Sequence, residues 1–132
     1  MTTKEYTPEH AANSGETPDI EAWPNQYPDR RYEILIEHPE FTCLCPRTGL
    51  PDFATIMVTY LPDQKCLELK SFKYYLNAFR QMGIFHENVV NRIRDDIIAA
   101  ADPHAVEVVG EFSVRGGLIT TIRSEWQRED EV

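Results

Sequence analysis

The sequence predicts an α+β fold with the element order ββααββ, in which one antiparallel sheet carries two helices on one face. Three observations indicate this fold. Segments near both ends have the β-branched, aromatic or alternating side chains of strands, and residues 72–101 repeat apolar side chains with the period of a helix. Gly116-Gly117 marks a tight hairpin between the last two strands. A chain of 132 residues, 42% of them apolar, fits one such domain.

Two strands are expected in the first half of the chain. Residues 32–37 (YEILIE) are enriched in apolar side chains, and residues 53–61 (FATIMVTYL) are rich in β-branched and aromatic residues. The segment 41–52 (FTCLCPRTGLPD) contains two prolines and a glycine, so we expect a loop there. Pro62-Asp63 ends the second strand, and residues 66–69 are expected to be a short extended piece.

Two helices follow. Ser71 is the predicted N-cap of the first helix and Gly83 its predicted stop. A second helix is expected over residues 87–101, ended by Asp102-Pro103. The apolar face of the first helix consists of Phe72, Tyr75, Leu76, Phe79 and Met82. The buried stripe of the second helix consists of Val89, Val90, Ile93, Ile97 and Ala101.

Two more strands complete the predicted sheet. Residues 106–114 alternate apolar side chains with polar ones, which predicts a strand with one apolar and one polar face. After the glycine pair, residues 118–126 form the returning strand. The last two strands are therefore expected to be an antiparallel hairpin.

The charge is concentrated at the two ends of the chain. The formal net charge is −9, but residues 1–30 hold six acidic and two basic side chains, and residues 124–132 hold four acidic and one basic. Residues 1–28 also contain four prolines, so we predict an acidic N-terminal arm that is mobile over much of its length, with Trp23 and Tyr27 docking its end. The predicted divisions are the arm at 1–28, a domain at 29–126 and an acidic tail at 127–132.

Composition excludes several protein classes. No apolar run has the length of a membrane span, and the N-terminus lacks the apolar core of a signal peptide, so we expect a cytoplasmic protein without a membrane partner. The acidic balance argues against nucleic acid as a partner. Three cysteines argue against a disulfide framework, and their spacing relative to the four histidines is a weak signal for zinc, so no metal is expected.

Cys45 is the strongest candidate for a chemical role. It precedes a rigid Pro-Arg-Thr-Gly turn, in which Arg47 would favour the thiolate. Asp52 follows seven residues later, just before a strand, so a thiolate and a carboxyl group would be available for covalent attack and proton donation. The alternatives are that Cys45 is a small buried hydrophobe and that Asp52 is a turn residue after Pro51.

Lys70 and Lys73 are candidates for binding an anion. They lie three residues apart at the start of the first helix, where the positive end of the helix dipole disfavours cations unless an anion is bound. Ordinary solvated lysines are the alternative, with Glu68 paired to one of them.

His86, Glu87 and Arg115 are further candidates. Glu87 suits the first turn of a helix, and a buried carboxylate there would also accept two N–H donors from a guanine-like edge. Arg115 precedes the glycine pair, which serves a hairpin and also permits close approach of a phosphate-bearing ligand.

Taken together, four motifs resemble those of a known family. FTCLCPRTGLPDFA (41–54), ELKSFK (68–73), FHE (85–87) and RGG (115–117) are similar, in this order, to motifs of the short, single-domain NADPH-dependent 7-cyano-7-deazaguanine reductases. These are the nitrile reductases of queuosine biosynthesis. The resemblance covers about residues 31–123, and the E-x-K-[SA]-x-K box is highly specific. It implies the tunnelling fold, in which sheets of several protomers join into a barrel ring, and a homo-oligomer, commonly a decamer of two stacked pentamers with sites between subunits.

The resemblance also implies a role for each motif residue. Cys45 attacks the nitrile carbon of 7-cyano-7-deazaguanine to give a thioimide, and Asp52 donates the accompanying proton. Two NADPH molecules per turnover supply hydrides that give 7-aminomethyl-7-deazaguanine, with no metal required. The residues implied in substrate binding are Leu67, Glu68, Leu69, His86 and Glu87. The residues implied in holding NADPH are Lys70, Lys73 and Arg115.

Two alternative functions stay open at this point. A tunnelling-fold cyclohydrolase acting on a pterin or purine would rely on zinc held by histidine and cysteine, and the chain offers no matching histidine pair. A non-catalytic protein that binds purines or pterins would keep Glu87 but would not need Cys45 and Asp52 together.

Overall fold

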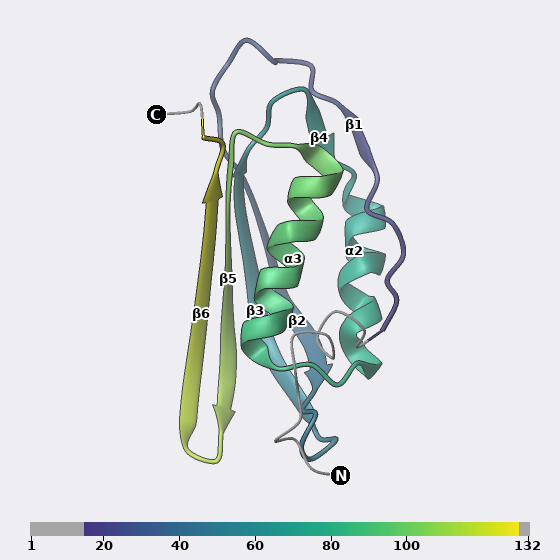
Figure 1. Cartoon of the computed structure of the whole chain (residues 1–132), viewed down its shortest axis with the longest axis vertical. Coiled ribbons are helices and arrows are strands. Elements are labelled where there is room, and N and C mark those ends of the chain that lie inside the picture. Colours follow the sequence, from purple (N-terminus) through teal and green to yellow (C-terminus); the bar gives the residue numbers. More distant parts are fainter. Residues whose placement is uncertain (1–14, 130–132) are drawn as a thin grey trace.

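The computed structural model describes residues 15–129. Its main sheet is antiparallel with the strand order β2-β3-β5-β6, and both helices lie on one face of this sheet (Figure 1). The predicted α+β class and the predicted arrangement of helices are therefore confirmed. The main strands are β2 (Ile34–Leu44), β3 (Pro51–Leu61), β5 (Ala105–Arg115) and β6 (Leu118–Gln127). The helices are α2 (Leu69–Asn77), the 3₁₀ helix η1 (Ala78–Gln81) and α3 (His86–Ala101).

The predicted loop at 41–52 is wrong at both of its ends. β2 continues to Leu44, and β3 already begins at Pro51, so that Cys43 pairs with Asp52. Pro39 is accommodated because β2 is an edge strand with a register shift between His38 and Phe41. The connection that carries Cys45 therefore spans only residues 45–50.

The first helix begins earlier than the sequence predicted. Glu68, and not Ser71, is the N-cap of α2, because its carboxylate accepts hydrogen bonds from Ser71 N at 2.8 Å and Lys70 N at 3.0 Å. The α-helical part ends at Asn77, and η1 continues the turn to Gln81. Both lysines of the box therefore lie within the first two turns of α2.

The second helix and the hairpin follow the prediction. All five residues predicted for the apolar stripe of α3 are buried against the sheet. Asp102 ends the helix in the left-handed conformation, and Gly116 and Gly117 form the β5–β6 turn with φ of 58° and 84°. At Gly110 of β5, an added Cβ would lie 2.8 Å from Val90 Cγ2, so α3 approaches the sheet at a position that needs glycine.

The chain before β2 packs on the helices. Residues 22–24 form β1 (Ala22–Pro24), which pairs antiparallel with β4 (Lys65–Leu67) in a second, small sheet. The domain therefore begins before residue 29, and the described part of the predicted arm, residues 15–28, belongs to it. Residues 1–14 of the predicted arm, with their predicted mobility, lie outside the described residues. Residues 130–132 of the predicted tail also lie outside them. Between residues 15 and 129, no helix has both the length and the apolar character for crossing a bilayer.

Candidate functional site

The residues predicted for catalysis meet in one open pocket. The pocket lies where the β2–β3 connection, the first turn of α3 and the β5–β6 hairpin come together, at the lower end of the molecule in Figure 1. Its cavity volume of about 540 Å³ is in the range of small-molecule sites. The predicted site residues that line it are Cys45, Asp52, His86, Glu87 and Arg115.

Backbone hydrogen bonds fix the loop that presents Cys45. Within the loop, Cys45 N donates to Leu50 O at 2.9 Å, and Gly49 N donates to Cys45 O at 2.8 Å. Just before the loop, Leu44 N donates to Met82 O at 2.8 Å, and Ile84 N donates to Leu44 O at 3.0 Å. The segment that leads into α3 is therefore tied to the residue before Cys45, which holds the thiol and His86 in one frame.

Cys45 is a better nucleophile than its neighbour Cys43. Burial alone would raise the pKa of the Cys45 thiol, but hydrogen bonds from Thr48, the Arg47 backbone and the Arg115 side chain outweigh it, so the pKa is lowered. Cys43 is fully buried, and its burial, together with the nearby Cys45, raises its pKa to about 12. Reactivity is therefore confined to Cys45 within this pair.

Asp52 is buried and held from two sides. His86 Nε2 lies 3.0 Å from Asp52 Oδ2, and Arg115 Nη1 donates a hydrogen bond to Asp52 Oδ1. Arg115 Nη2 also donates to Thr48 Oγ1 at 2.7 Å. The carboxylate is thereby aimed into the pocket, and the arginine connects it to the loop of Cys45.

The ring of His86 is held by stacking. It lies parallel to the ring of Phe112, with the ring centroids 3.7 Å apart and the planes within 7°. Burial lowers the pKa of His86, although the nearby Glu87 carboxylate raises it. The contact with the Asp52 carboxylate requires an N–H at Nε2, which donates to Oδ2.

Thr48 and Phe112 belong to this site but were not among the predicted site residues. From the sequence, Thr48 is part of the turn after Cys45, and Phe112 belongs to the apolar face of the strand that alternates over residues 106–114. A signal for Phe112 is present in that alternation, because it places Phe112 on the sheet face that the start of α3 covers.

The other predicted binding residues do not line this pocket, and Leu67 lies far from it. Leu67 N donates to Tyr60 Oη at 2.9 Å, and Tyr60 lies eight residues beyond Asp52 along β3. At roughly 3.3 Å per residue this separation is about 26 Å. Glu68, Leu69 and Lys70 follow Leu67 at the start of α2, and Lys73 lies one turn further along; none of the five lines the pocket of Cys45.

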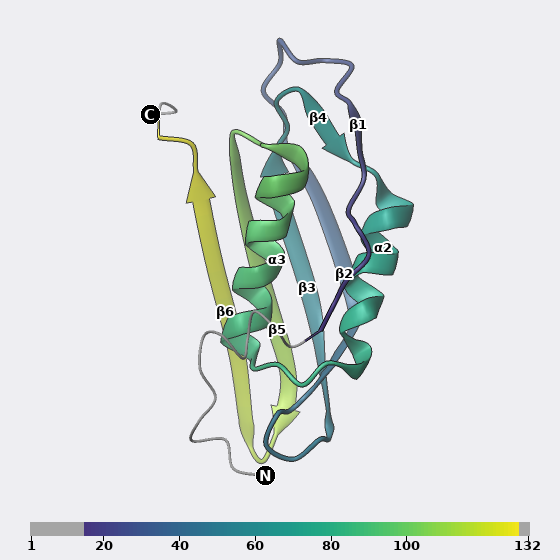
Figure 2. The same cartoon turned by 45° about the vertical axis from the view of Figure 1, so that its right-hand side comes forward.

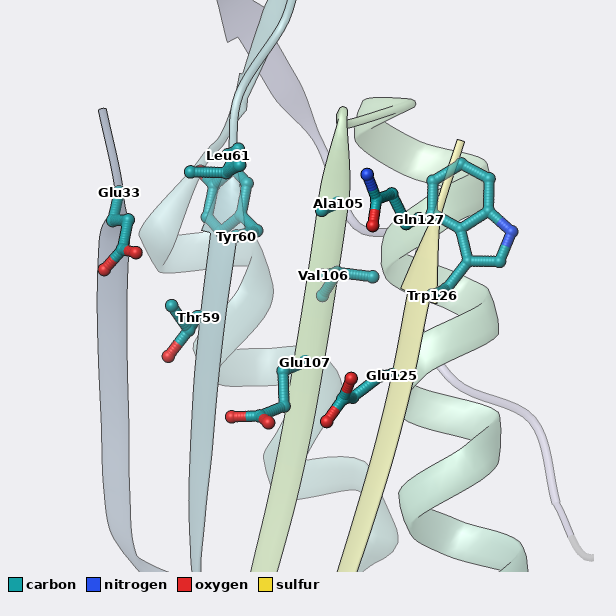
Figure 3. A pocket seen from close by; sticks show the side chains of 10 residues that line it. All are labelled: Glu33, Thr59, Tyr60, Leu61, Ala105, Val106, Glu107, Glu125, Trp126 and Gln127. Atoms are coloured by element: carbon teal, nitrogen blue, oxygen red, sulfur yellow. The ribbon is translucent and has the colours of Figure 1, made fainter. Parts of the chain in front are cut away.

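A different pocket lies across the far end of the sheet. Figure 3 shows its side chains on β3, β5 and β6 and just before β2, among them Glu33, Glu107 and Glu125. Its lining includes none of the predicted site residues, and Glu107 is paired with Arg123 at 3.3 Å. No group of three or more His, Cys, Asp and Glu side chains within residues 15–129 is arranged to hold a metal ion.

Comparison with known proteins decides between the families that this pocket would fit. A family model described as QueF-like protein matches residues 51–131, which is more than half of the chain. The chain belongs to the QueF-like family. The resemblance seen in the four motifs is thereby confirmed.

Relatives of this QueF-like chain cover most of its length. A protein of Elusimicrobium minutum (strain Pei191) named NADPH-dependent 7-cyano-7-deazaguanine reductase is 49% identical over 126 residues, which is 94% of this chain and 95% of that protein. A protein of the same name from Anaeromyxobacter sp. (strain Fw109-5) is 58% identical over 104 residues, covering 79% of this chain and 85% of that protein.

A solved structure shares the fold of this QueF-like chain. The crystal structure of the archaeosine synthase QueF-Like in the apo form matches with a TM-score of 0.66 at 22% identity. The match covers 70% of this chain and 91% of that one. The two chains therefore have the same arrangement of strands and helices over most of their length.

Proposed function

We propose that this chain is an NADPH-dependent reductase that converts the nitrile of 7-cyano-7-deazaguanine into the primary amine of 7-aminomethyl-7-deazaguanine, in queuosine biosynthesis. The observation that carries the proposal is the thiol of Cys45, with its lowered pKa, in one pocket with the Asp52–His86 pair. The curated relatives that cover most of the chain bear the name of this activity.

Cys45 makes the nitrile reducible. Its thiolate adds to the nitrile carbon, so that a C–S bond forms while one π bond of the C≡N group breaks, and the nitrogen takes a proton. A protonated thioimide accepts a hydride far more readily than a nitrile does, so the covalent step divides a difficult reduction. NADPH supplies the two hydrides when it is bound, one for each reduction. The thiolate of Cys45 leaves after the first of them.

Asp52 is the proposed proton carrier: it takes the proton that the Cys45 thiol gives up and passes it to the nitrile nitrogen. In the free chain both of its oxygens are held, one by His86 and the other by Arg115. Donation requires that one oxygen turns to the substrate. Arg115 keeps Asp52 aimed at the pocket while the adduct forms, and because it is also the proposed partner of an NADPH phosphate, the cofactor later competes for the same side chain.

Recognition of the substrate falls to residues from two copies of the chain. Glu87 in the first turn of α3 lies in the catalytic pocket, where its carboxylate accepts N–H donors of the deazaguanine edge, and His86 lies beside it. Within one chain, Leu67 contacts Tyr60, which lies roughly 26 Å from Asp52 along β3, so we propose that Leu67, Glu68 and Leu69 line the pocket of a second copy. The same copy would supply Lys70 and Lys73 for the phosphates of NADPH.

The proposed assembly is a ring of the tunnelling fold, most simply a decamer of two stacked pentamers. β2 and β6 are the outer strands of the four-stranded sheet, and each carries backbone groups along one side that a neighbouring sheet would pair. Closure of a ring pairs these edges and brings the ends of adjacent chains together.

The chemistry is tested by mixing the protein with 7-cyano-7-deazaguanine in the absence of NADPH and recording the intact mass. The wild-type chain should gain the full mass of the substrate, and the Cys45→Ala variant should gain nothing while it still binds the ligand. Tight binding by the wild-type chain without an adduct would instead identify a non-catalytic purine-binding protein.

A further inference from the structure

Residues 15–24 form a strap across the helical layer. Figure 2 shows this segment passing the gap between α3 and α2 and reaching β1 beside β4. Residues 17–20 line a hollow together with Tyr75 of α2 and Asp96 of α3, and Ile20 packs against the hydrophobic core. The strap therefore contacts both helices before it reaches the small sheet.

The upper end of the strap is bonded to the E-x-K-[SA]-x-K box itself. Glu21 N donates to Ser71 Oγ at 2.8 Å, and Glu68 N donates to Glu21 O at 2.9 Å. Ser71 Oγ in turn donates to Glu68 O at 2.9 Å. One residue of the strap thus satisfies polar groups at both ends of the turn that presents Lys70.

Beyond Glu21, the strap also aligns the residues before the box. Ala22 is paired with Leu67 in β1–β4, while Leu69 and Lys70 are exposed. The exposed side chains have little packing of their own, so the position of their backbone depends on these backbone partners.

The lower end of the strap contacts the residues that hold the loop of Cys45. Gly15 O accepts a hydrogen bond from Arg92 Nη2 at 2.9 Å, and a Cβ at Gly15 would lie 3.0 Å from the side chain of Met82. Met82 O is the acceptor for Leu44 N, directly before Cys45. The strap therefore runs between the two parts of the chain that the proposed function assigns to opposite halves of a site.

We propose that the strap positions the recognition half-site, with Glu21 acting through its backbone and Ser71 through its hydroxyl as positioning residues for Leu67–Lys70. This rests on the proposed function, because it assumes that these residues bind substrate and cofactor. Neither Glu21 nor Ser71 touches the reacting atoms. Their effect is on the geometry with which the box meets its ligands.

The test uses single substitutions in the full chain. Glu21→Pro removes the N–H that reaches Ser71, and Ser71→Ala removes the acceptor. Glu16→Pro is the matched control, because Glu16 is an exposed residue of the same strap whose N–H makes no hydrogen bond to any residue of the described range. KM for NADPH and for the nitrile, kcat, and the rate of iodoacetamide alkylation of Cys45 are measured for each.

Each of the two variants should raise KM for the nitrile or for NADPH roughly fivefold, as expected for one lost hydrogen bond. Their kcat and their Cys45 alkylation rates should stay near those of the wild-type chain, and Glu16→Pro should match the wild-type chain throughout. The double variant should lose no more than Ser71→Ala alone, because that substitution already removes the contact with Glu21.

Unchanged KM values in Glu21→Pro and Ser71→Ala would overturn the positioning role while leaving the reductase assignment intact. A raised KM accompanied by a lower kcat and a changed rate of Cys45 alkylation would also overturn it, since that pattern indicates general loosening of the fold. A wild-type chain that consumes no NADPH with the nitrile would contradict the proposed function and this inference together.

Discussion

Arg115 and Asp52 form an ion pair that ties the end of β5 to the start of β3 in the pocket of Cys45. The motif resemblance implied that Arg115 holds a phosphate of NADPH. In the free chain this guanidinium already donates hydrogen bonds to Asp52 and Thr48. A bound phosphate must compete with both, so cofactor binding and the freedom of Asp52 are linked through one side chain.

Arg115→Ala should therefore slow formation of the Cys45 adduct even without NADPH, by roughly tenfold. It removes a hydrogen bond that lowers the pKa of Cys45 and a contact that aims Asp52. The adduct rate of Arg115→Lys should lie between those of the wild-type chain and Arg115→Ala, because one ammonium group cannot reproduce the guanidinium fork that reaches two partners. Time courses of the intact mass measure this rate. An unchanged adduct rate with a raised KM for NADPH would reduce Arg115 to a cofactor ligand.

Thr48→Val should make Cys45 less reactive at neutral pH. The Thr48 side chain bonds the thiolate and lowers its pKa, so its loss raises the pKa and shrinks the thiolate fraction at pH 7. The pH profile of iodoacetamide alkylation should shift to higher pH. Thr42→Val is the control, because within residues 15–129 the Thr42 hydroxyl bonds only the Glu40 carbonyl. Equal profiles for Thr48→Val and wild type would remove Thr48 from the activation of Cys45.

Phe112→Leu tests whether the ring under His86 contributes to kcat as well as to the free energy of unfolding. It removes the ring on which His86 stacks, and it also removes buried volume. Phe41→Leu is the control, since Phe41 is about equally buried but packs against Phe79 and neither stacks on His86 nor lines the pocket. Both variants should lose roughly 1–2 kcal/mol of unfolding free energy in urea titrations. Only Phe112→Leu should also lose kcat, and equal kcat losses would contradict a role for the stack.

Gly110→Ala tests how closely α3 packs on the sheet. The added methyl group would lie 2.8 Å from Val90 Cγ2 and 2.9 Å from Phe112 Cε1, so about 1–3 kcal/mol of stability should be lost. At Gly83 the nearest atom would be 3.6 Å away, so Gly83→Ala should cost much less. Similar thermal unfolding temperatures for the two variants would show that the sheet and α3 adjust at little cost.

Local periodicity accounts for most of what the sequence predicted of the fold. The stripe of α3 and the hairpin at Gly116-Gly117 depend on neighbours in sequence, and both were found as predicted. The start of α2 was missed because a glutamate cap is a less common signal than the serine three residues later. The extension of β2 past Pro39 was missed because the edge position that tolerates proline is a property of the sheet order.

The catalytic pocket could be predicted further than the recognition residues. Cys45, Asp52, His86 and Arg115 follow from motifs, and the pocket brings all four together. Their mutual contacts did not follow, since Arg115 meets Asp52 only through the register of β3 with β5. The distance to Leu67 depends on the length of β3 and on the contact with Tyr60, which no local pattern contains.

Complementation between two inactive chains tests most directly whether each site is built from two copies. Cys45→Ala removes the nucleophile, and Leu69→Glu places an unfavourable charge at an exposed position of the recognition half-site, where a helix start tolerates an acid. The two variants are co-expressed with different tags, and complexes that carry both tags are assayed for NADPH oxidation with the nitrile. Each variant alone should be inactive.

The mixed complexes should recover about one quarter of the wild-type activity, because intact halves meet at about one interface in four when the two chains assemble at random. Mixed complexes that stay as inactive as either variant alone would mean that catalytic and recognition residues must come from the same chain, which would contradict a site shared between two copies.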